Sequence, residues 1–139
     1  MGSPPHLQAL RHLFESAPVS RYLGHELVAL GGGRAEVRLP YRDEFDQGFG
    51  VVHGGIVATL ADTAGYFAAA SLLEDGVVTT VEFKVNLAEA ARRETLVGVG
   101  EAMSRGRSLI VCRMTVRGAD DRVVAVAQGT YAIRESRRA

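Results

Sequence analysis

The sequence predicts an α+β fold in which one antiparallel sheet of about six strands wraps a single long helix. Three observations lead to this prediction. A long apolar stretch follows a glycine pair at 54–55, four strand-like runs follow that stretch, and two more precede it around the glycine triplet 31–33. The connections between the runs are short, which favours antiparallel neighbours. We expect one domain over residues 1–139, because a chain of this length buries a sizeable core.

The composition is that of an ordinary globular protein and excludes several classes of function. Hydrophobic residues make up 47% of the chain and charged residues 23%. Sixteen Lys and Arg balance sixteen Asp and Glu, so there is no overall field to attract nucleic acid or an anionic membrane. With a single cysteine, Cys112, and no secretory leader pattern at the start, we expect a cytoplasmic protein.

The first predicted element is a short amphipathic helix over residues 6–15, within an N-terminal helical segment at 1–19. We expect Pro18 and the residues after it to end this helix. Its apolar side chains recur at helical spacing and should pack on the body of the domain. They are Leu7, Leu10, Leu13 and Phe14.

Two strands are predicted next, near 21–30 and over 34–40, as a hairpin around the glycine triplet. The second strand alternates cleanly between apolar and charged residues, as a half-buried strand should. We expect one face to point inward, formed by Ala35, Val37 and Leu39, and the other outward, formed by Arg34, Glu36 and Arg38.

The long helix should follow a polar, glycine-punctuated loop at 41–54 and end near Leu73. A membrane span over 55–73 is the alternative, since the run is about long enough. However, Asp62 lies at its centre and the run is rich in Gly and Ala rather than Leu. Because a helix that is apolar nearly all round belongs inside a protein, we interpret it as a buried central helix.

The rest of the chain predicts strands at 77–87, 94–103, 107–118 and 122–134. The first of these alternates between two faces. One face is apolar, with Val77, Val81, Phe83, Val85 and Leu87, and the other is polar, with Thr80, Glu82, Lys84 and Asn86. Only residues 135–139 are expected to form a loose tail.

Asp62 is the residue in the apolar helix that most needs a chemical explanation. Removing a carboxylate from water costs several kcal/mol, roughly, unless something compensates. Small residues at 55, 58, 65 and 69 share its stripe on the helical wheel together with Tyr66, which would leave the carboxylate reachable in dry surroundings. Such a carboxylate has either a catalytic task or a structural partner, and the spacing alone favours neither.

The loop before the helix supplies further candidates. Gly54 and Gly55 would expose unpaired N–H groups at the positive end of the helix, which suits a carbonyl oxygen that gains negative charge. Gln47 offers an amide to orient a carbonyl group or a water molecule. His53 is a candidate for direct contact with substrate, and the alternative is that it braces the local backbone. No cluster of His, Cys, Asp and Glu has the spacing of a metal site, so no metal is predicted.

Five stretches together resemble a known family. Residues 47–55 (QGFGVVHGG) followed by Leu60-Ala61-Asp62, then residues 80–86 and 104–107, and finally residues 125–131 (AVAQGTY) are similar to hotdog-fold acyl-CoA thioesterases. The likeness is to the phenylacetate-pathway (PaaI-like) and 4-hydroxybenzoyl-CoA thioesterase groups, and it covers residues 20–134. It implies a long helix wrapped by a curved sheet and hydrolysis of an acyl-CoA to free acid and coenzyme A.

The resemblance also implies roles for particular residues. Asp62 takes the place of the catalytic carboxylate, as nucleophile or general base, and the Gly54 N–H that of the donor to the thioester carbonyl. Gln47 stands where the family has Asn or Gln, and Thr80 where some members hold a water-orienting Ser or Thr. Gln47 is similar to one pattern within the family and Asp62 to another, and this chain combines the two.

The resemblance further points to substrate-binding residues. Tyr66 replaces a residue that is sometimes Thr and is expected to shape the acyl pocket. The candidates on the coenzyme A side are Arg105 and Arg107. Coenzyme A is part of the substrate, and no separate cofactor is implied.

Helix geometry predicts that two chains share each site. Gly54 and Asp62 are eight residues apart on one helix, which is about 12 Å. The resemblance likewise implies a homodimer with active sites at the interface, or a tetramer of two dimers.

Two alternatives to a thioesterase remain at this stage. One is a hotdog protein that binds acyl-CoA without hydrolysing it, and the other, which the residues fit less well, is a hotdog hydratase or dehydratase. The sequence does not decide whether the acyl group is aryl or medium-chain. Its choice depends on which aromatic side chains line the pocket, with Phe49, Tyr66, Phe67 and Phe83 as candidates.

Overall fold

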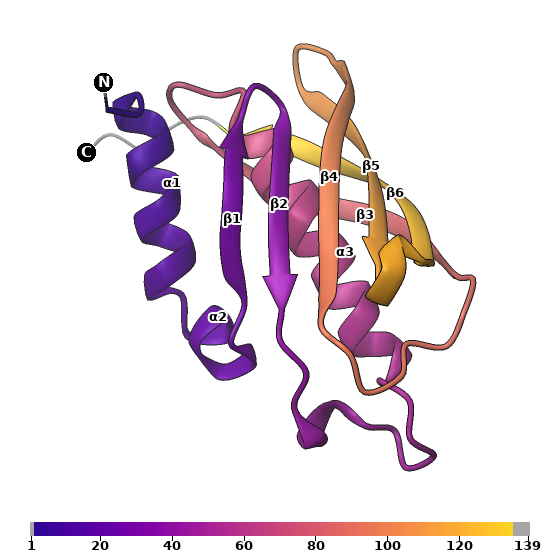
Figure 1. Ribbon diagram of the computed structural model, residues 1–139. Helices are drawn as coiled ribbons and strands as arrows, with labels where there is room; N and C mark the ends of the chain where they lie inside the picture. Colours follow the sequence, from indigo (N-terminus) through magenta and orange to yellow (C-terminus); the bar gives the residue numbers. More distant parts are fainter. Residues whose placement is uncertain (1, 135–139) are drawn as a thin grey trace.

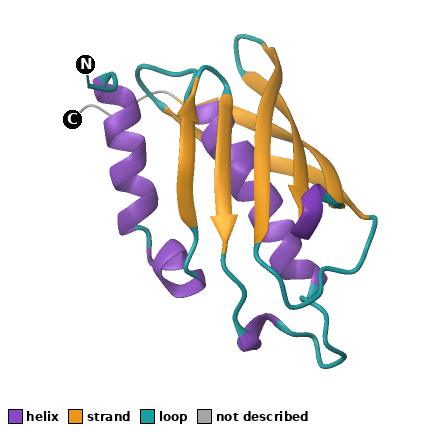
Figure 2. Cartoon of the chain, in the orientation of Figure 1, coloured by secondary structure: helices purple, strands orange, loops and turns teal. Residues whose placement is uncertain are grey.

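The computed structural model describes residues 2–134 and shows one curved antiparallel sheet with a long helix in its concave face (Figures 1 and 2). The strands lie in the order β1-β2-β4-β5-β6-β3. This arrangement confirms the predicted fold class. The helices are α1 (Pro5–Ser16), α2 (Pro18–Leu23) and α3 (Gly54–Ala70), and the strands are β1 (Glu26–Gly31), β2 (Arg34–Leu39), β3 (Val77–Leu87), β4 (Leu96–Arg105), β5 (Leu109–Arg117) and β6 (Val123–Arg134), with short 3-10 turns at Asp43–Phe45 and Ala119–Asp121.

The sheet wraps closely around α3 because glycines face the helix. A methyl group at Gly98 of β4 would lie 3.2 Å from the Leu60 carbonyl oxygen, and one at Gly100 would overlap the Ala64 carbonyl. Leu60 and Ala64 have no exposed surface, so this contact lies in the core. Strand and helix therefore approach as closely as backbone atoms allow.

The long helix ends three residues earlier than predicted, at Ala70 rather than near Leu73. Its last turn tightens, because the N–H groups of Leu72 and Leu73 donate to carbonyls three residues back. Ser71 fixes this end, since its hydroxyl donates to the Ala68 carbonyl and accepts the Gly33 N–H. The turn between β1 and β2 is thus tied to the end of α3.

The prediction of a strand from residue 21 was wrong, because residues 18–23 form the second helix, α2. Pro18 occupies its first turn, where the fixed φ of proline suits a helix and the missing N–H costs nothing. Gly24 ends α2 with a φ of 76° and donates its N–H to the Ser20 carbonyl. The strand therefore begins only at Glu26.

The other strands lie close to their predicted places. In β2 the inward residues Ala35, Val37 and Leu39 are at most 1% exposed, which confirms the predicted alternation. The ends of β4, β5 and β6 are within two residues of those predicted. The predicted tail at 135–139 lies outside the described residues.

Strand β3 has its predicted bounds, but its alternation is broken. The pairing of β3 with β6 shifts register between Thr80 and Glu82, which is a β-bulge at Val81. Before the bulge the buried residue is Val78, whereas Val77, predicted to point inward, is 50% exposed. The bulge reverses which residues face the helix, and this brings Thr80 to the helix side of the sheet.

Candidate active site

Asp62 is half-buried on α3 and is held by two hydroxyl groups from the sheet. The Thr80 hydroxyl on β3 and the Tyr131 hydroxyl on β6 each donate to Asp62 Oδ1 at 3.0 Å. Tyr131 also lies 3.3 Å from the Asp62 carbonyl oxygen. Within residues 2–134 no group donates a hydrogen bond to the second oxygen, Oδ2. One carboxylate oxygen is therefore fixed, and the other is available to react.

Burial dominates the electrostatics of this carboxylate. Desolvation raises the pKa of Asp62, and the two hydrogen bonds from Thr80 and Tyr131 partly oppose the rise. Burial also raises the pKa of Tyr131, with the nearby Asp62 charge adding to the effect. Tyr131 therefore stays protonated and acts as a donor. A carboxylate with a raised pKa is a better base than one in open water.

Two glycines make room for the Tyr131 hydroxyl. A methyl group at Gly65, one turn after Asp62, would overlap this hydroxyl, and one at Gly129 would lie 3.1 Å from it. Tyr131 itself has no exposed surface. The sequence therefore folds locally so that a fully buried phenol reaches the carboxylate through a gap between helix and strand.

A cavity of about 260 Å³ adjoins the carboxylate and is bounded by all three helices. Tyr66 lines it, and its ring packs edge to face on Phe67, with 5.2 Å between centroids. Besides Asp62, Thr63, Tyr66 and Phe67 of α3, the walls are Leu13, Ala17, Val19 and Ser20. The cavity is mostly apolar with one carboxylate, which suits an apolar group attached to a polar reacting centre.

The start of α3 presents one uncommitted N–H. His53 is the N-cap, and its Nδ1 accepts the Gly55 N–H at 2.8 Å. The N–H groups of Ile56 and Val57 both reach the His53 carbonyl. Within residues 2–134 the Gly54 N–H has no acceptor, so it is the first-turn donor that remains free for a ligand.

The predicted site residues fall into three separate groups within one chain. Asp62 and Tyr66 lie at the middle of α3, and Thr80 of β3 contacts Asp62 there. At the start of the same helix are His53, Gly54 and Gly55, and Gln47 lies exposed in the preceding loop, where its N–H donates to the Val51 carbonyl. At the far end, Arg105 donates to the Leu72 carbonyl and Arg107 is exposed in the β4–β5 turn. Their catalytic and binding roles stay predictions.

The sequence reasoning missed Tyr131 and the cavity walls at Leu13 and Val19. Tyr131 lies within a stretch that resembled the family, but no role was inferred for it. Gly65 and Gly129 are the sequence features that could have pointed to Tyr131, since small residues on facing elements mark the space that a large side chain fills. The cavity walls have no local signal, because they come from helices remote from Asp62 in the sequence.

Two negative findings concern residues 2–134. No cluster of three metal-ligating side chains occurs among them. None of their helices combines the length and apolar character required to cross a bilayer.

Comparisons with known proteins identify the family. The sequence model of the thioesterase superfamily matches residues 49–125. A candidate esterase of Saccharolobus solfataricus is 30% identical, with 91% of each chain covered. The 1,4-dihydroxy-2-naphthoyl-CoA hydrolase of Listeria monocytogenes is 26% identical, with 84% of this chain and 95% of that protein covered.

A solved structure agrees with the sequence comparisons. The crystal structure of a thioesterase family protein from Silicibacter pomeroyi is 34% identical and superimposes with a TM-score of 0.90, with 94% of this chain and 99% of that chain covered. The hotdog arrangement and the family resemblance are thereby confirmed. The chain belongs to the thioesterase superfamily and is a thioester hydrolase.

Proposed function

We propose that the enzyme hydrolyses an aryl or medium-chain acyl-CoA, with Asp62 as nucleophile or general base. The observation that carries this proposal is the state of the Asp62 carboxylate. One oxygen accepts from Thr80 and Tyr131, the other has no partner among residues 2–134, and the side chain lines an apolar cavity. The oxygen without a protein partner is the one that we propose reacts.

The chemistry follows from these positions. As general base, Asp62 takes a proton from a water molecule, whose oxygen bonds to the thioester carbonyl carbon; the carbon–sulfur bond then breaks, and the coenzyme A thiolate accepts the proton. As nucleophile, Asp62 bonds to the same carbon and releases the thiolate, and water hydrolyses the resulting anhydride. In both routes the carbonyl oxygen becomes negative, and the Gly54 N–H is the proposed donor to it.

The proposed active site spans two subunits of a homodimer. Within one chain, Gly54 and Asp62 are separated by about 12 Å along α3, too far to act on one carbonyl group. The donor would therefore come from the partner subunit. Strand β3 lies at an edge of the sheet and exposes Val77, Val81 and Leu87, which supports burial of this face in a dimer. A tetramer of two dimers is compatible with the same interface.

The acyl class is proposed from a relative and from the cavity, and the coenzyme A contacts from the chemistry of two arginines. The Listeria relative is named for an aromatic acyl-CoA, and a cavity of about 260 Å³ exceeds the roughly 150 Å³ of a cavity that holds benzene. Arg105 and Arg107 are the proposed partners of the coenzyme A phosphates, since guanidinium groups pair well with phosphate oxygens.

The test measures release of free thiol from a panel of aryl-CoA and alkyl-CoA thioesters by the parent protein and by Asp62→Asn. Asparagine keeps an oxygen that Thr80 and Tyr131 can bond, so the fold and the oligomer should be retained while hydrolysis is abolished. The protein's own thiol should not contribute a background, because Cys112 is fully buried and burial raises its pKa to about 11.

Two results would contradict the proposal. Hydrolysis by Asp62→Asn at the parent rate would remove the assigned role of the carboxylate. Binding of acyl-CoA without turnover by the parent protein would favour a non-catalytic acyl-CoA-binding protein.

A further inference from the structure

The cavity beside Asp62 shares a wall residue with a second cavity. A second cavity of about 690 Å³ lies farther along the space between α1 and α3, where β3 begins. One residue, Leu13 of α1, lines both cavities. On α3 the walls pass from Asp62 and Phe67 at the first cavity to Ala70 at the second. The two hollows therefore follow one another along the same helix pair.

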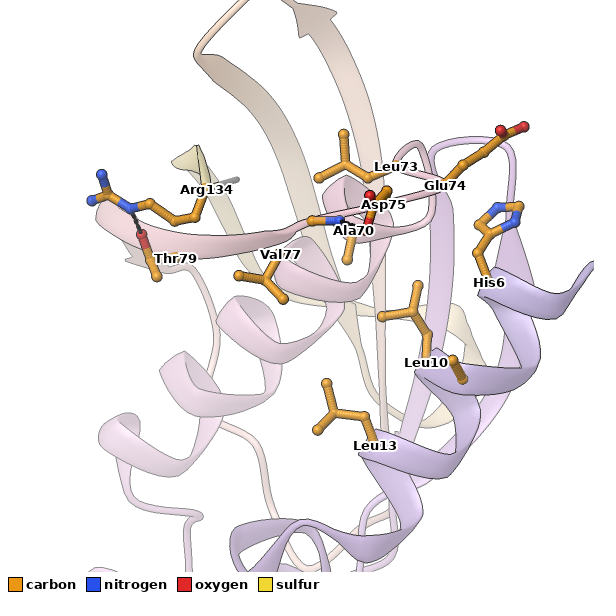
Figure 3. Close-up of a pocket in the computed structure, with 12 residues that line it drawn as sticks. His6, Leu10, Leu13, Ala70, Leu73, Glu74, Asp75, Val77, Thr79 and Arg134 are labelled. Atoms are coloured by element: carbon orange, nitrogen blue, oxygen red, sulfur yellow. Dashed lines mark hydrogen bonds between the residues drawn. The ribbon is translucent and has the colours of Figure 1, made fainter. Parts of the chain in front are cut away.

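Figure 3 shows the second cavity and the side chains around it. Leu10 and Leu13 project from α1 toward α3, and Leu73 and Val77 contribute further apolar surface. The polar part of the lining includes Arg134, which donates to Thr79 of β3 at 3.1 Å. The wall that the two helices give to this cavity, with Leu10 and Leu13 on α1 and Ala70 on α3, is apolar.

We propose that the acyl chain of the substrate runs from Asp62 along the space between α1 and α3, and that Leu13 sets the chain length that the enzyme accepts. This inference rests on the proposed thioesterase function. The thioester carbonyl lies at Asp62, a short acyl group fills the first cavity, and a longer unbranched chain must pass Leu13 to enter the second.

The dimensions fit a medium-length chain. From Asp62 to Ala70, α3 rises about 12 Å. A zigzag carbon chain with bonds of about 1.5 Å advances about 1.2 Å per bond, so about ten carbons cover this distance. An acyl group of four carbons stays in the first cavity, whereas one of twelve carbons reaches beyond Leu13 into the second.

The experiment compares kcat/KM for dodecanoyl-CoA and butanoyl-CoA in the parent and in three variants. Leu13→Ala widens the passage and should raise the dodecanoyl-to-butanoyl ratio about fourfold or more, which is the effect of taking one or more further methylenes out of water. Leu13→Trp should lower the ratio, because the larger side chain blocks the passage that only the longer acyl chain needs. Leu13 is 44% exposed, so both replacements should fold.

The matched control is Leu7→Ala, the same substitution on the same helix. Leu7 lines neither cavity and packs instead against the turn at Gly31. The dodecanoyl-to-butanoyl ratio of Leu7→Ala should equal that of the parent. A thermal melt of each variant checks that the fold is intact.

The outcomes separate the two proposals. An unchanged ratio in both Leu13 variants, with butanoyl-CoA still hydrolysed and Asp62→Asn inactive, would overturn the acyl path alone. An equal shift in Leu7→Ala would also overturn it. If the parent hydrolysed neither thioester nor any other acyl-CoA, the proposed function itself would be wrong and the acyl path with it.

Discussion

Replacing Gly54 with proline deletes one backbone N–H and should slow hydrolysis at least a hundredfold while the protein stays folded. Gly54 is the first residue of α3, where proline is favoured because the missing N–H has no acceptor within the helix. The residue before it, His53, has φ −56° and ψ 132°, which lies in the extended region that a following proline requires. A Cβ at this position would meet Leu87, whose Cδ1 lies 2.6 Å away, and the end of this side chain has to shift to make room.

The magnitude follows from the role assigned to the N–H. In other enzymes, loss of one oxyanion donor lowers kcat by about 10² to 10³, or about 2.7 to 4 kcal/mol of barrier. A loss in this range is expected because the Gly55 N–H is held by His53 and cannot substitute. The effect should fall on kcat rather than KM, since negative charge on the carbonyl oxygen develops in the transition state.

The assay is steady-state thiol release from the best acyl-CoA of the panel, with Gly54→Ala as the matched control. Alanine brings the same contact with Leu87 but keeps the N–H, so it should slow hydrolysis only modestly. A thermal melt and the oligomeric state confirm the fold of both variants. Equal kcat values for Gly54→Pro and Gly54→Ala would refute the oxyanion role, and a change confined to KM would assign the N–H to substrate binding.

Three further predictions concern the groups around Asp62 and the core. Tyr131→Phe removes a hydrogen bond that lowers the pKa of Asp62, so the acidic limb of the kcat/KM–pH profile should move to higher pH; an unmoved limb would contradict the contact. Burial lowers the pKa of His25 from 6.5 to about 4, so the unfolded chain binds a proton at this histidine more readily than the folded chain does. The free energy of unfolding should therefore fall by about 3 kcal/mol as the pH is lowered from 6.5 to 4. Urea unfolding of His25→Leu over this range should lack that loss, and an undiminished loss would show that another group causes it. Gly100→Ala places a methyl group on a backbone carbonyl of α3 and should cost about 2 kcal/mol or more in the same assay, whereas Gly106→Ala in the β4–β5 turn, with its nearest neighbour at 3.5 Å, should cost little; equal costs would refute the close-approach argument.

The regular elements could be predicted because their signals are local. Alternation in β2 and the apolar run of α3 each depend on residues that are near one another in the sequence. The errors arose where a local signal was ambiguous or overridden. Pro18 could end one helix or begin another, and the end of α3 at Ala70 is set by Ser71, which bonds to the distant Gly33.

Part of the candidate site could likewise be read from the sequence. A carboxylate in an apolar helix and a glycine pair at its start are visible without a structure, so Asp62 and Gly54 were found. Tyr131 was not given a role, because it lies 69 residues after Asp62 and only the packing of β6 on α3 joins them. Thr80 was placed by resemblance to the family alone.

The sequence by itself determined the fold class, the family resemblance and the carboxylate that we propose reacts, because these follow from patterns within single segments. The tertiary structure decided what the carboxylate contacts. The bulge at Val81 turns Thr80 toward α3, Gly65 leaves the space that the Tyr131 hydroxyl fills, and α1 encloses the space that leads past Leu13. Each depends on segments remote in the chain that meet only when the sheet closes around the helix, so no pattern within one segment can specify it.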